Sequence, residues 1–594
     1  MHKNPEMTLN RLRKYSTTEN PKFKRLYTCF YSMEFFKLAY SNIYSKPGNM
    51  TKASDGSTID GMSEERINKL IQSFKDGTYQ PTNLRRVNIP KKNGKTRPIS
   101  IPSFNDKLVQ EIIRMILEAI YEDTFSDHSH GFRPNRSCHT ALEYVRKKFQ
   151  ATAWFIEGDI ENCFENINHV ILLNILREKI TDLRFIHLIN LFLKAGYIEN
   201  WKYHKTYSGV PQGSIVSPIL FNIYMDKFDK FMERKIKEFD TGTRRHVLSE
   251  YNNLHTNLRR TRRRLKRNEN VKQNKIILKK QIHELKLCQH ARDMMDETYK
   301  RMRYVRYADD FLIGIIGSKK EIKELNDEIK LWFPQELKLS LSPKKHKITH
   351  NSKNIRFLGY DIVVVRHSQK KPENGNIRLS VPYELMVDFI IQNRYGKWWN
   401  NPNSGKDELK GICRPELMNL DDLEILFQYN WKIRGLYNYY CLSENVYKLN
   451  GFGHIIQTSF MRTLAGKYKT SCAKLYRNPN YSQRKKGKTV VGVTHKDKFY
   501  EYFDGPFNKK VKTTCVDEKT NTNKASGRTL MIKRFDAHIC EFCGDTEGPF
   551  EIHHVKKLKD LKGKSDWEKL MISRHRKTLV LCKNCHYKLH AGKL

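Results

Sequence analysis

Two adjacent aspartates, Asp309 and Asp310, constrain the fold most strongly, because they stand in a short link between the strand-like runs RYVRY and FLIGII. A third carboxylate, Asp159, follows the strand-like run WFIEG in a similar setting. Neighbouring side chains on a strand face opposite ways, but at a hairpin tip both can approach one site. Carboxylates gathered at adjacent strand ends are costly unless metal ions neutralise them. The pattern favours a two-metal site for phosphoryl transfer, with ions about 3.5–4 Å apart; the alternative is two surface hairpins with solvated aspartates.

The charge of the chain indicates the kind of partner. Lys and Arg number 109 against 64 Asp and Glu, a formal net charge of +45 in 594 residues. Such a basic chain is typical of proteins that bind polyanions, since each neutralised phosphate releases counterions. Hydrophobic residues make up 39% of the chain, which is enough for folded cores. The first 20 residues contain no apolar signal region, and no apolar run approaches the roughly 18 residues of a membrane span. We therefore expect a cytoplasmic, nucleic-acid-binding protein that is not in a membrane.

The middle of the chain alternates between helical and strand-like patterns. The stretch after Ser63 is expected to form a capped amphipathic helix, and residues 107–125 repeat its pattern. Between 233 and 300 lies a basic insertion, in which residues 259–267 hold seven basic residues in nine; it is either a solvated helical hairpin or a phosphate contact. Residues 380–478 are expected to be helical, with aromatics that form either a core or an RNA-facing surface together with basic residues (Lys432, Arg434, Lys467, Lys469, Lys474). Residues 483–530 are expected to be a linker or a loosely folded basic module.

Four of the twelve cysteines form two CxxC pairs near the C-terminus, Cys540 with Cys543 and Cys582 with Cys585. Without an export signal a disulfide framework is not expected, whereas four thiolates suit one tetrahedral zinc site. The pairs are farther apart than in a simple zinc ribbon, and His-rich sequence lies between and after them. The pattern CKNCH also fits a c-type haem attachment, but that reading requires export and leaves the first pair unexplained. A zinc module that only binds DNA is a second alternative.

Six segments in order resemble the motifs of the reverse transcriptase family. They are KKNGKTRPISIP (91–102), SHGFRPNRSCHTAL (129–142), GDIENCF (158–164), SGVPQGSIVSPILFNIYMDKFD (208–229), YADD (307–310) and NIRFLGY (354–360). The second segment is similar to a block typical of bacterial intron-encoded enzymes. By this resemblance the last segment is the strand that closes the palm of a right-hand polymerase.

The resemblance implies roles for individual residues. Asp159 and Asp309 would be the ligands of the polymerase metal ions, with Asp310 beside them and the backbone carbonyl of Ile160 as a further oxygen. In the nucleotide site, Arg97 and Lys92 would neutralise the triphosphate, Phe164 would exclude a ribose 2′-hydroxyl by steric clash, and Gln212 would lie along the nucleotide. One departure is Ser214, where many relatives have a second glycine.

The C-terminal module resembles an HNH nuclease of the ββα-metal type with a cysteine-stapled core. By that resemblance His554 is the general base that activates water, and Glu551 orients the histidine pair. The family's middle asparagine would fall near Lys577, so that Lys577 or Thr578 would have to supply its polar contact. The ligands of a divalent ion on the scissile phosphate would be His553, His586 and His590.

Taken together, the chain is similar to group II intron-encoded proteins of the bacterial, mitochondrial-like lineage. The expected fold is α+β and multidomain: a right-hand polymerase with a helical thumb, a basic DNA-binding segment and a small zinc-stapled nuclease. The expected domains are an N-terminal extension (1–85), fingers and palm (86–375, with the insertion 233–300), thumb and maturase domain X (376–482), DNA-binding segment (483–533) and HNH endonuclease (534–594).

The resemblance implies four activities: assisting intron RNA splicing, staying on the excised lariat as a ribonucleoprotein, nicking target double-stranded DNA, and extending the new 3′ end with dNTPs. It also implies Mg²⁺ at the polymerase and nuclease sites, with Mn²⁺ as an alternative, and structural Zn²⁺. Two rivals are a non-mobile reverse transcriptase, which would lack the long helical segment and the nuclease, and a splicing-only RNA-binding factor, which would not need YADD and Asp159. Oligomeric state and the recognised target stay open.

Overall fold

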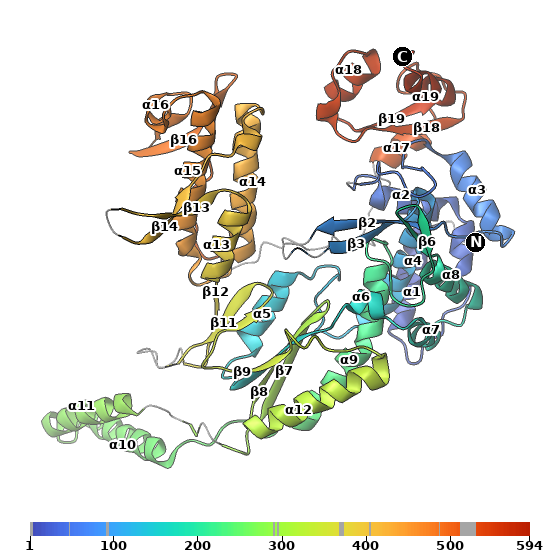
Figure 1. The fold of residues 1–594 in the computed structure, drawn as a ribbon. Coiled ribbons are helices and arrows are strands. Elements are labelled where there is room, and N and C mark those ends of the chain that lie inside the picture. The colour runs from blue at the N-terminus through green and yellow to red at the C-terminus, as the bar shows by residue number, and fades with distance from the viewer. Residues whose placement is uncertain are drawn as a thin grey trace.

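In the computed structural model, several connected bodies lie around a central sheet, which the sequence predicts to be the palm (Figure 1). The N-terminal extension and the C-terminal module lie together on one side, the thumb lies on another, and one helical hairpin projects away from the rest. Among the described residues, no helix combines the length and apolar character needed to cross a bilayer. The structure describes residues 4–46, 48–90, 94, 96–288, 292–293, 296–366, 374–402, 405–485, 487–510 and 530–594.

The N-terminal extension and the fingers share one hydrophobic core with the palm and the nuclease. The predicted helix after Ser63 is confirmed: the Ser63 hydroxyl accepts a hydrogen bond from the amide of Arg66 (3.2 Å) and caps α3. The elements are α1 (Pro5–Ser16), α2 (Met33–Ile43), β1 (Met62–Ser63) and α3 (Glu64–Lys75), followed by the sheet β3-β2-β5-β6, made of β2 (Leu84–Pro90), β3 (Thr96–Ile101), β5 (Tyr197–Glu199) and β6 (Lys202–His204).

The described residues of the fingers and palm also form several helices. The pattern at 107–125 is confirmed as a helix, α4, whose residues are almost all buried. The helices are α4 (Phe104–Tyr121), α5 (Cys138–Lys148), α6 (Cys163–Asn166), α7 (His169–Arg177), α8 (Leu183–Lys194), α9 (Ser217–Phe239) and α12 (Lys319–Trp332).

The palm sheet has the strand order β7-β8-β4-β9. Both strand predictions are confirmed, because YADD links β7 to β8 and the run WFIEGD forms β4. Gly158 is required in β4, since a Cβ there would lie 2.1 Å from the ring of Phe311. The strands are β4 (Trp154–Asp159), β7 (Arg301–Tyr307), β8 (Asp310–Ile316) and β9 (Lys347–His350).

The segment NIRFLGY was expected to be the strand that closes the palm, and that prediction is wrong. Leu358 and Gly359 both have positive φ (47° and 70°), so the chain turns sharply between β10 (Ile355–Phe357) and β11 (Tyr360–Val364). These strands form a separate sheet with β12 (Ile377–Ser380), and β9 occupies the palm edge instead.

The basic insertion folds as a helical hairpin of α10 (Ser249–Lys266) and α11 (Val271–Leu287). It begins later than expected, because α9 continues to Phe239. All seven basic residues of 259–267 are exposed, and in α10 only Leu258 and Thr261 are buried. The solvated hairpin and a phosphate-contacting surface are therefore compatible readings of the same element.

The thumb is built around a second hydrophobic core. Residues 482–485, 488–495 and 498–501 form a three-stranded sheet whose Val491 and Val493 are buried in that core. Of the two expected alternatives, a linker or a loosely folded basic module, the linker is therefore wrong for this part; the part from 511 to 529 lies outside the described residues. The elements are α13 (Tyr383–Gln392), the hairpin β13 (Gly396–Asn400) and β14 (Asp407–Gly411), α14 (Asp422–Tyr440), α15 (Leu449–Lys467), α16 (Cys472–Arg477), β15 (Ser482–Lys485), β16 (Lys488–His495) and β17 (Lys498–Glu501).

The C-terminal module completes its sheet with a strand from the other end of the chain. β1 pairs antiparallel with β18, placing Met62 opposite Ile552 and Ser63 opposite Glu551. The sheet order is β1-β18-β19, so the nuclease sheet is not confined to the last 61 positions of the chain. The module's own elements are α17 (Leu530–Asp536), β18 (Phe550–His554), α18 (Asp566–Ser573), β19 (Thr578–Cys582) and α19 (Lys583–His590).

Candidate functional site

Three residues with carboxylate side chains lie at one end of the palm sheet. Asp159 ends β4 and is paired directly with Asp310, the first residue of β8, while Asp309 lies in the preceding turn. Burial raises the pKa of Asp309 and of Asp310 above the ordinary carboxyl range, and the negative charges of their neighbours raise both further. Lys345 donates a hydrogen bond to Asp159 (Nζ to Oδ1, 2.8 Å). The group is crowded with negative charge, as a divalent-metal site requires.

A buried ion pair beneath this turn supports it. Arg306 is fully buried and contacts Asp229 through two nitrogens (Nε to Oδ1, 2.8 Å; Nη2 to Oδ2, 2.5 Å). Its Nη1 also donates to the carbonyl of Ala308 (3.0 Å), which has φ of +54°. Sequence reasoning missed this pair, because β7 carries three arginines (RMRYVRY) and the sequence does not show that Arg306 is the buried one that must have a partner.

The segment 129–142 braces the turn from the other side. The backbone of Gly131 approaches so closely that a Cβ there would lie 2.4 Å from the amide nitrogen of Ala308. The amide of His130 donates to the carbonyl of Arg306 (2.9 Å), and Asn222 donates to the carbonyl of Gly131 (2.9 Å).

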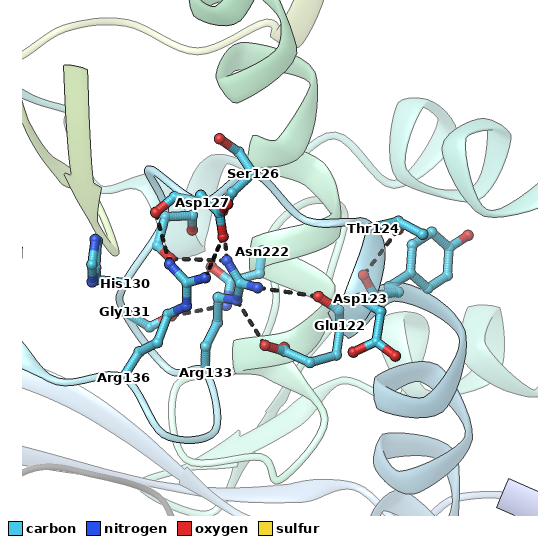
Figure 2. Close-up of polar contacts among 12 residues, drawn as sticks. Glu122, Asp123, Thr124, Ser126, Asp127, His130, Gly131, Arg133, Arg136 and Asn222 are labelled. Carbon is cyan, nitrogen blue, oxygen red and sulfur yellow. Dashed lines mark hydrogen bonds and ion pairs between the residues drawn. The ribbon is translucent and has the colours of Figure 1, made fainter. Parts of the chain in front are cut away.

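Two arginines hold this brace in shape (Figure 2). Arg133 donates to the Glu122 carboxylate (2.9 Å) and to the backbone carbonyls of Ser126 (2.6 Å) and Ser129 (2.9 Å). Arg136 donates to the carbonyl and carboxylate of Asp127, each at 2.7 Å. The loop that meets YADD is therefore fixed by charge-assisted hydrogen bonds.

The proposed sugar-contacting ring is half-buried among other rings. Phe164 stacks on Phe221 (centroids 4.5 Å apart, planes 13° apart) and meets Phe132 edge-on at 6.0 Å. Phe132 is 38% exposed and has φ of +59°. These contacts leave Phe164 little freedom to move aside, as a steric gate requires.

The proposed triphosphate residues lie at the edge of the fingers. Arg97 donates to the side-chain oxygen of Gln212 (Nε to Oε1, 2.7 Å), so two of the predicted residues are in direct contact. A cavity of about 300 Å³ lies beside Gln212, lined in part by Arg86 and Lys205. Ser214, at the departure from the family pattern, is buried.

The last two predicted residues of the polymerase site are Ile160 and Lys92. The side chain of Ile160 is buried, and its backbone forms an isolated bridge with Leu341. Lys92 lies outside the described residues.

In the C-terminal module the four predicted cysteines converge. The sulfur atoms of Cys540, Cys543, Cys582 and Cys585 all lie within 4.8 Å of one another. The Sγ atoms of Cys543 and Cys582 are 3.8 Å apart, a separation typical of two ligands of one tetrahedral ion. The cluster is compatible with zinc.

The predicted histidine ligands converge as well, and a residue that sequence reasoning missed joins them. We call His553, His586 and His590 the nuclease histidine cluster; their ring nitrogens lie within 4.8 Å of one another and of a carboxylate oxygen of Asp60. Glu551 contacts His586 (Oε2 to Nδ1, 2.5 Å). Burial alone would lower the pKa of His586, but Asp60 and Glu551 raise it to about 9.

His554, the proposed base, lies apart from this cluster. Its Nε2 is 2.7 Å from the hydroxyl of Tyr40, and the ring is 5% exposed. Burial lowers the pKa of His554 to about 3, so the ring is neutral. Successive side chains on a strand point to opposite faces, which separates His554 from His553. Across the strand pair Thr578 lies opposite His554, and its hydroxyl accepts a hydrogen bond from Arg534 (3.2 Å).

Family comparisons divide the chain into three functional regions. Residues 89–251 and 282–362 match reverse transcriptase (RNA-dependent DNA polymerase), 374–526 match type II intron maturase, and 540–586 match the AI2M/AI1M-like HNH endonuclease. The interruption in the first match falls within the α10–α11 hairpin. The protein is thus a reverse transcriptase that carries maturase and HNH endonuclease domains.

Whole-chain relatives narrow the class further. The chain is 41% identical over 587 residues to the group II intron-encoded protein LtrA of Lactococcus lactis subsp. cremoris, covering 95% of both proteins. It is 34% identical over 581 residues to the putative COX1/OXI3 intron 2 protein of Saccharomyces cerevisiae, covering 94% of this chain and 65% of that protein. The chain belongs to the group II intron-encoded protein family.

Proposed function

We propose that this chain assists the splicing of a group II intron and mobilises that intron, using its palm for cDNA synthesis and its C-terminal module for nicking DNA. The observation that carries the proposal is the pairing of Asp159 with Asp310 beside Asp309, in a chain whose C-terminal module holds a second cluster of metal-binding residues. The proposed domain boundaries are those given for the sequence, with the nuclease extended to include β1.

At the palm, Asp159 and Asp309 hold divalent ions, Mg²⁺ or Mn²⁺, with the carbonyl of Ile160. Such ions supply charge stabilisation to the attacking and leaving oxygens of phosphoryl transfer. Asp310 sets the charge around these ligands. Its raised pKa means that ion binding must displace protons from the group.

Around the nucleotide, each side chain has a separate task. Arg97 and Lys92 neutralise the triphosphate of a dNTP, and the Arg97 contact with Gln212 fixes both side chains along the nucleotide. Phe164, held between Phe221 and Phe132, excludes the 2′-hydroxyl of a ribonucleotide.

At the nuclease, the four cysteines would hold structural zinc, and the nuclease histidine cluster would hold a divalent ion that stabilises charge on the scissile phosphate. His554 is the base that takes a proton from water. Its neutral ring can accept a proton, but burial that lowers its pKa to about 3 makes it a weak base. Exchange of the Tyr40 hydroxyl for water at Nε2 is therefore required, both to free the nitrogen and to restore its basicity.

Intron RNA is bound through basic surfaces away from both sites. The exposed basic residues of α10 and the positively charged thumb offer phosphate contacts over a long RNA. The bound lariat then guides the protein to double-stranded DNA, in the bacterial cytoplasm.

Paired variants of the ribonucleoprotein test this division. Asp159→Ala should stop cDNA synthesis, His586→Ala should stop nicking, and both should splice as the wild type does. Metal analysis should find about one zinc per chain, lost in Cys540→Ser because structural zinc binding is itself folding free energy. One variant that lost polymerisation and nicking together, while still folded, would contradict two separate sites.

A further inference from the structure

Asp60 reaches the nuclease histidine cluster from the N-terminal extension, far outside the residues that match the HNH family. Its Oδ2 lies 2.8 Å from Nε2 of His590 and 3.5 Å from Nε2 of His586. Its Oδ1 lies 3.2 Å from Nδ1 of His553. The histidine nitrogens are themselves spaced by 3.4 Å (His553 to His586) and 3.2 Å (His586 to His590).

The backbone fixes Asp60 in this position. The amide of Gly61 donates to the carbonyl of Ile552 (3.2 Å), immediately before the β1–β18 pairs begin. Gly61 has φ of +71°, and a Cβ there would lie 3.7 Å from the His586 ring, so the chain passes directly over the cluster. The Asp60 Oδ1 also accepts a hydrogen bond from the amide of His554 (2.7 Å).

Contacts elsewhere hold the two ends of the chain together without Asp60. Lys37 of α2 lies 2.6 Å from Glu64 at the start of α3 and 2.8 Å from Asp536 at the end of α17. Ile59 and Met62, on either side of Asp60 in the chain, are each 1% exposed. The carboxylate is therefore presented to the histidines by a docked and buried segment.

The spacing of these atoms fits one ion. Ligands at about 2.0–2.2 Å from a common centre are separated by about 2.8–3.1 Å from their nearest neighbours in octahedral geometry and by about 3.3–3.6 Å in tetrahedral geometry. The measured separations of 2.8–3.5 Å span these two ranges. We propose that Asp60 is the fourth protein ligand of the nuclease ion, supplied by the N-terminal extension.

A carboxylate in this set determines which ion binds. Three imidazoles alone suit Zn²⁺, Ni²⁺ or Cu²⁺, whereas carboxylate oxygens suit Mg²⁺ and Mn²⁺. An octahedral ion with four protein ligands keeps two positions for water and a phosphate oxygen. Asp60 thus shifts the site toward the hard ions that support cleavage, an inference that rests on the proposed nuclease function.

Metal binding measured apart from cleavage tests the inference. The full zinc-loaded chain would carry Asp309→Ala, so that binding of Mn²⁺, followed by its electron paramagnetic resonance signal, reports on the nuclease. Asp60→Asn should weaken Mn²⁺ binding by about tenfold or more but change Ni²⁺ affinity by less than about threefold, because the histidines stay in place. Asn keeps an acceptor for the His554 amide, so the docked segment should persist.

Two matched variants separate the outcomes. Asp55→Asn lies in the same loop, exposed and bonded to Ser57, and should bind Mn²⁺ as the parent does. His586→Ala should lose both ions. Unchanged Mn²⁺ affinity in Asp60→Asn would overturn the assignment of Asp60 as a ligand, and equal loss of Mn²⁺ and Ni²⁺ would overturn its effect on the choice of ion. Unchanged Mn²⁺ binding in His586→Ala would instead overturn the proposed nuclease site itself.

Discussion

The polymerase and nuclease sites both gather metal-binding side chains, but their charges are balanced in opposite ways. The polymerase carboxylates Asp159, Asp309 and Asp310 repel one another, and Lys345 is the cation bonded to Asp159. The nuclease histidine cluster faces the carboxylates of Asp60 and Glu551. These carboxylates attract the histidines when the imidazole rings are protonated. Without ions, charge repulsion therefore destabilises the polymerase site, whereas charge attraction stabilises the nuclease site.

The difference explains why the palm needs a frame. The buried Arg306–Asp229 pair and the brace around Gly131 hold the YADD turn from two sides, against the repulsion of its own carboxylates. The nuclease cluster instead needs contact between distant parts of the chain. We expect palm variants to lose cDNA synthesis without other change. Nuclease variants should lose nicking, either at the catalytic step or because the N-terminal extension no longer contacts the C-terminal module.

The largest effect should follow from removing a palm ligand. Asp309→Ala should lower cDNA synthesis by about a thousandfold or more, because charge stabilisation by the ions is lost. Primer extension on an RNA template measures it, and splicing of the intron RNA should continue. Asp327→Ala, an exposed carboxylate on α12, is the matched control. If a folded Asp309→Ala protein lost splicing to the same extent as cDNA synthesis, the polymerase site and the RNA-binding surface would not be separate.

At the nuclease, the proposed base and its partner should behave differently. His554→Ala should slow nicking by about 10²–10⁴-fold, as loss of a general base does, while keeping zinc. Tyr40→Phe releases His554 from its hydroxyl partner and should nick at least as fast as the wild type. Rates of strand nicking on target DNA measure both. Full cleavage by His554→Ala would assign the base elsewhere.

A smaller effect is expected in nucleotide selection. Phe164→Val should reduce discrimination between dNTPs and ribonucleotides by about 10–100-fold, because the smaller side chain admits a 2′-hydroxyl. The ratio of kcat/KM for the two nucleotides is the measurement. Val170→Ala, an exposed residue on α7, serves as control. An unchanged ratio would remove Phe164 from the site.

The smallest effect, on stability, probes the repulsion directly. The folded-state pKa of Asp310 is raised. At a pH above this raised pKa the ionised carboxylate destabilises the fold, and the destabilisation disappears as the pH falls toward the ordinary pKa range of carboxyl groups. Asp310→Asn should therefore stabilise the Mg²⁺-free protein by about 1–3 kcal/mol at pH 8 and by less at pH 5. Thermal unfolding at both values tests this, and a larger gain at pH 5 would contradict the repulsion.

The two sites also differ in how much of them the sequence predicts. The palm residues are found from local motifs, because each motif ends a strand and the strands share one sheet. The cysteines and the histidines of α19 are likewise local patterns. Asp60 carries no such signal, since its role comes from pairing with residues about 500 positions away.

The features that the sequence analysis predicted wrongly or missed also have physical explanations. NIRFLGY was read as one strand, yet two consecutive positive φ values at Leu358 and Gly359 fold it into a hairpin. Residues 482–501 have few apolar positions, but Val491 and Val493 alternate and so place one face of a sheet on the thumb core. Arg306 and Asp229 are separated by 77 positions, so each lacked a visible partner in the sequence.

The pairing of β1 with β18 has a consequence for synthesis of the protein. Asp60 and His590 are 530 positions apart, so at about 5–20 residues per second the ribosome reaches the second roughly 30–100 s after the first. The strand that pairs with Met62 and Ser63 is synthesised only after every palm strand has been made. A translation product that stops before residue 550 would carry a polymerase without a nuclease, so nicking activity marks a chain translated past its last ligand.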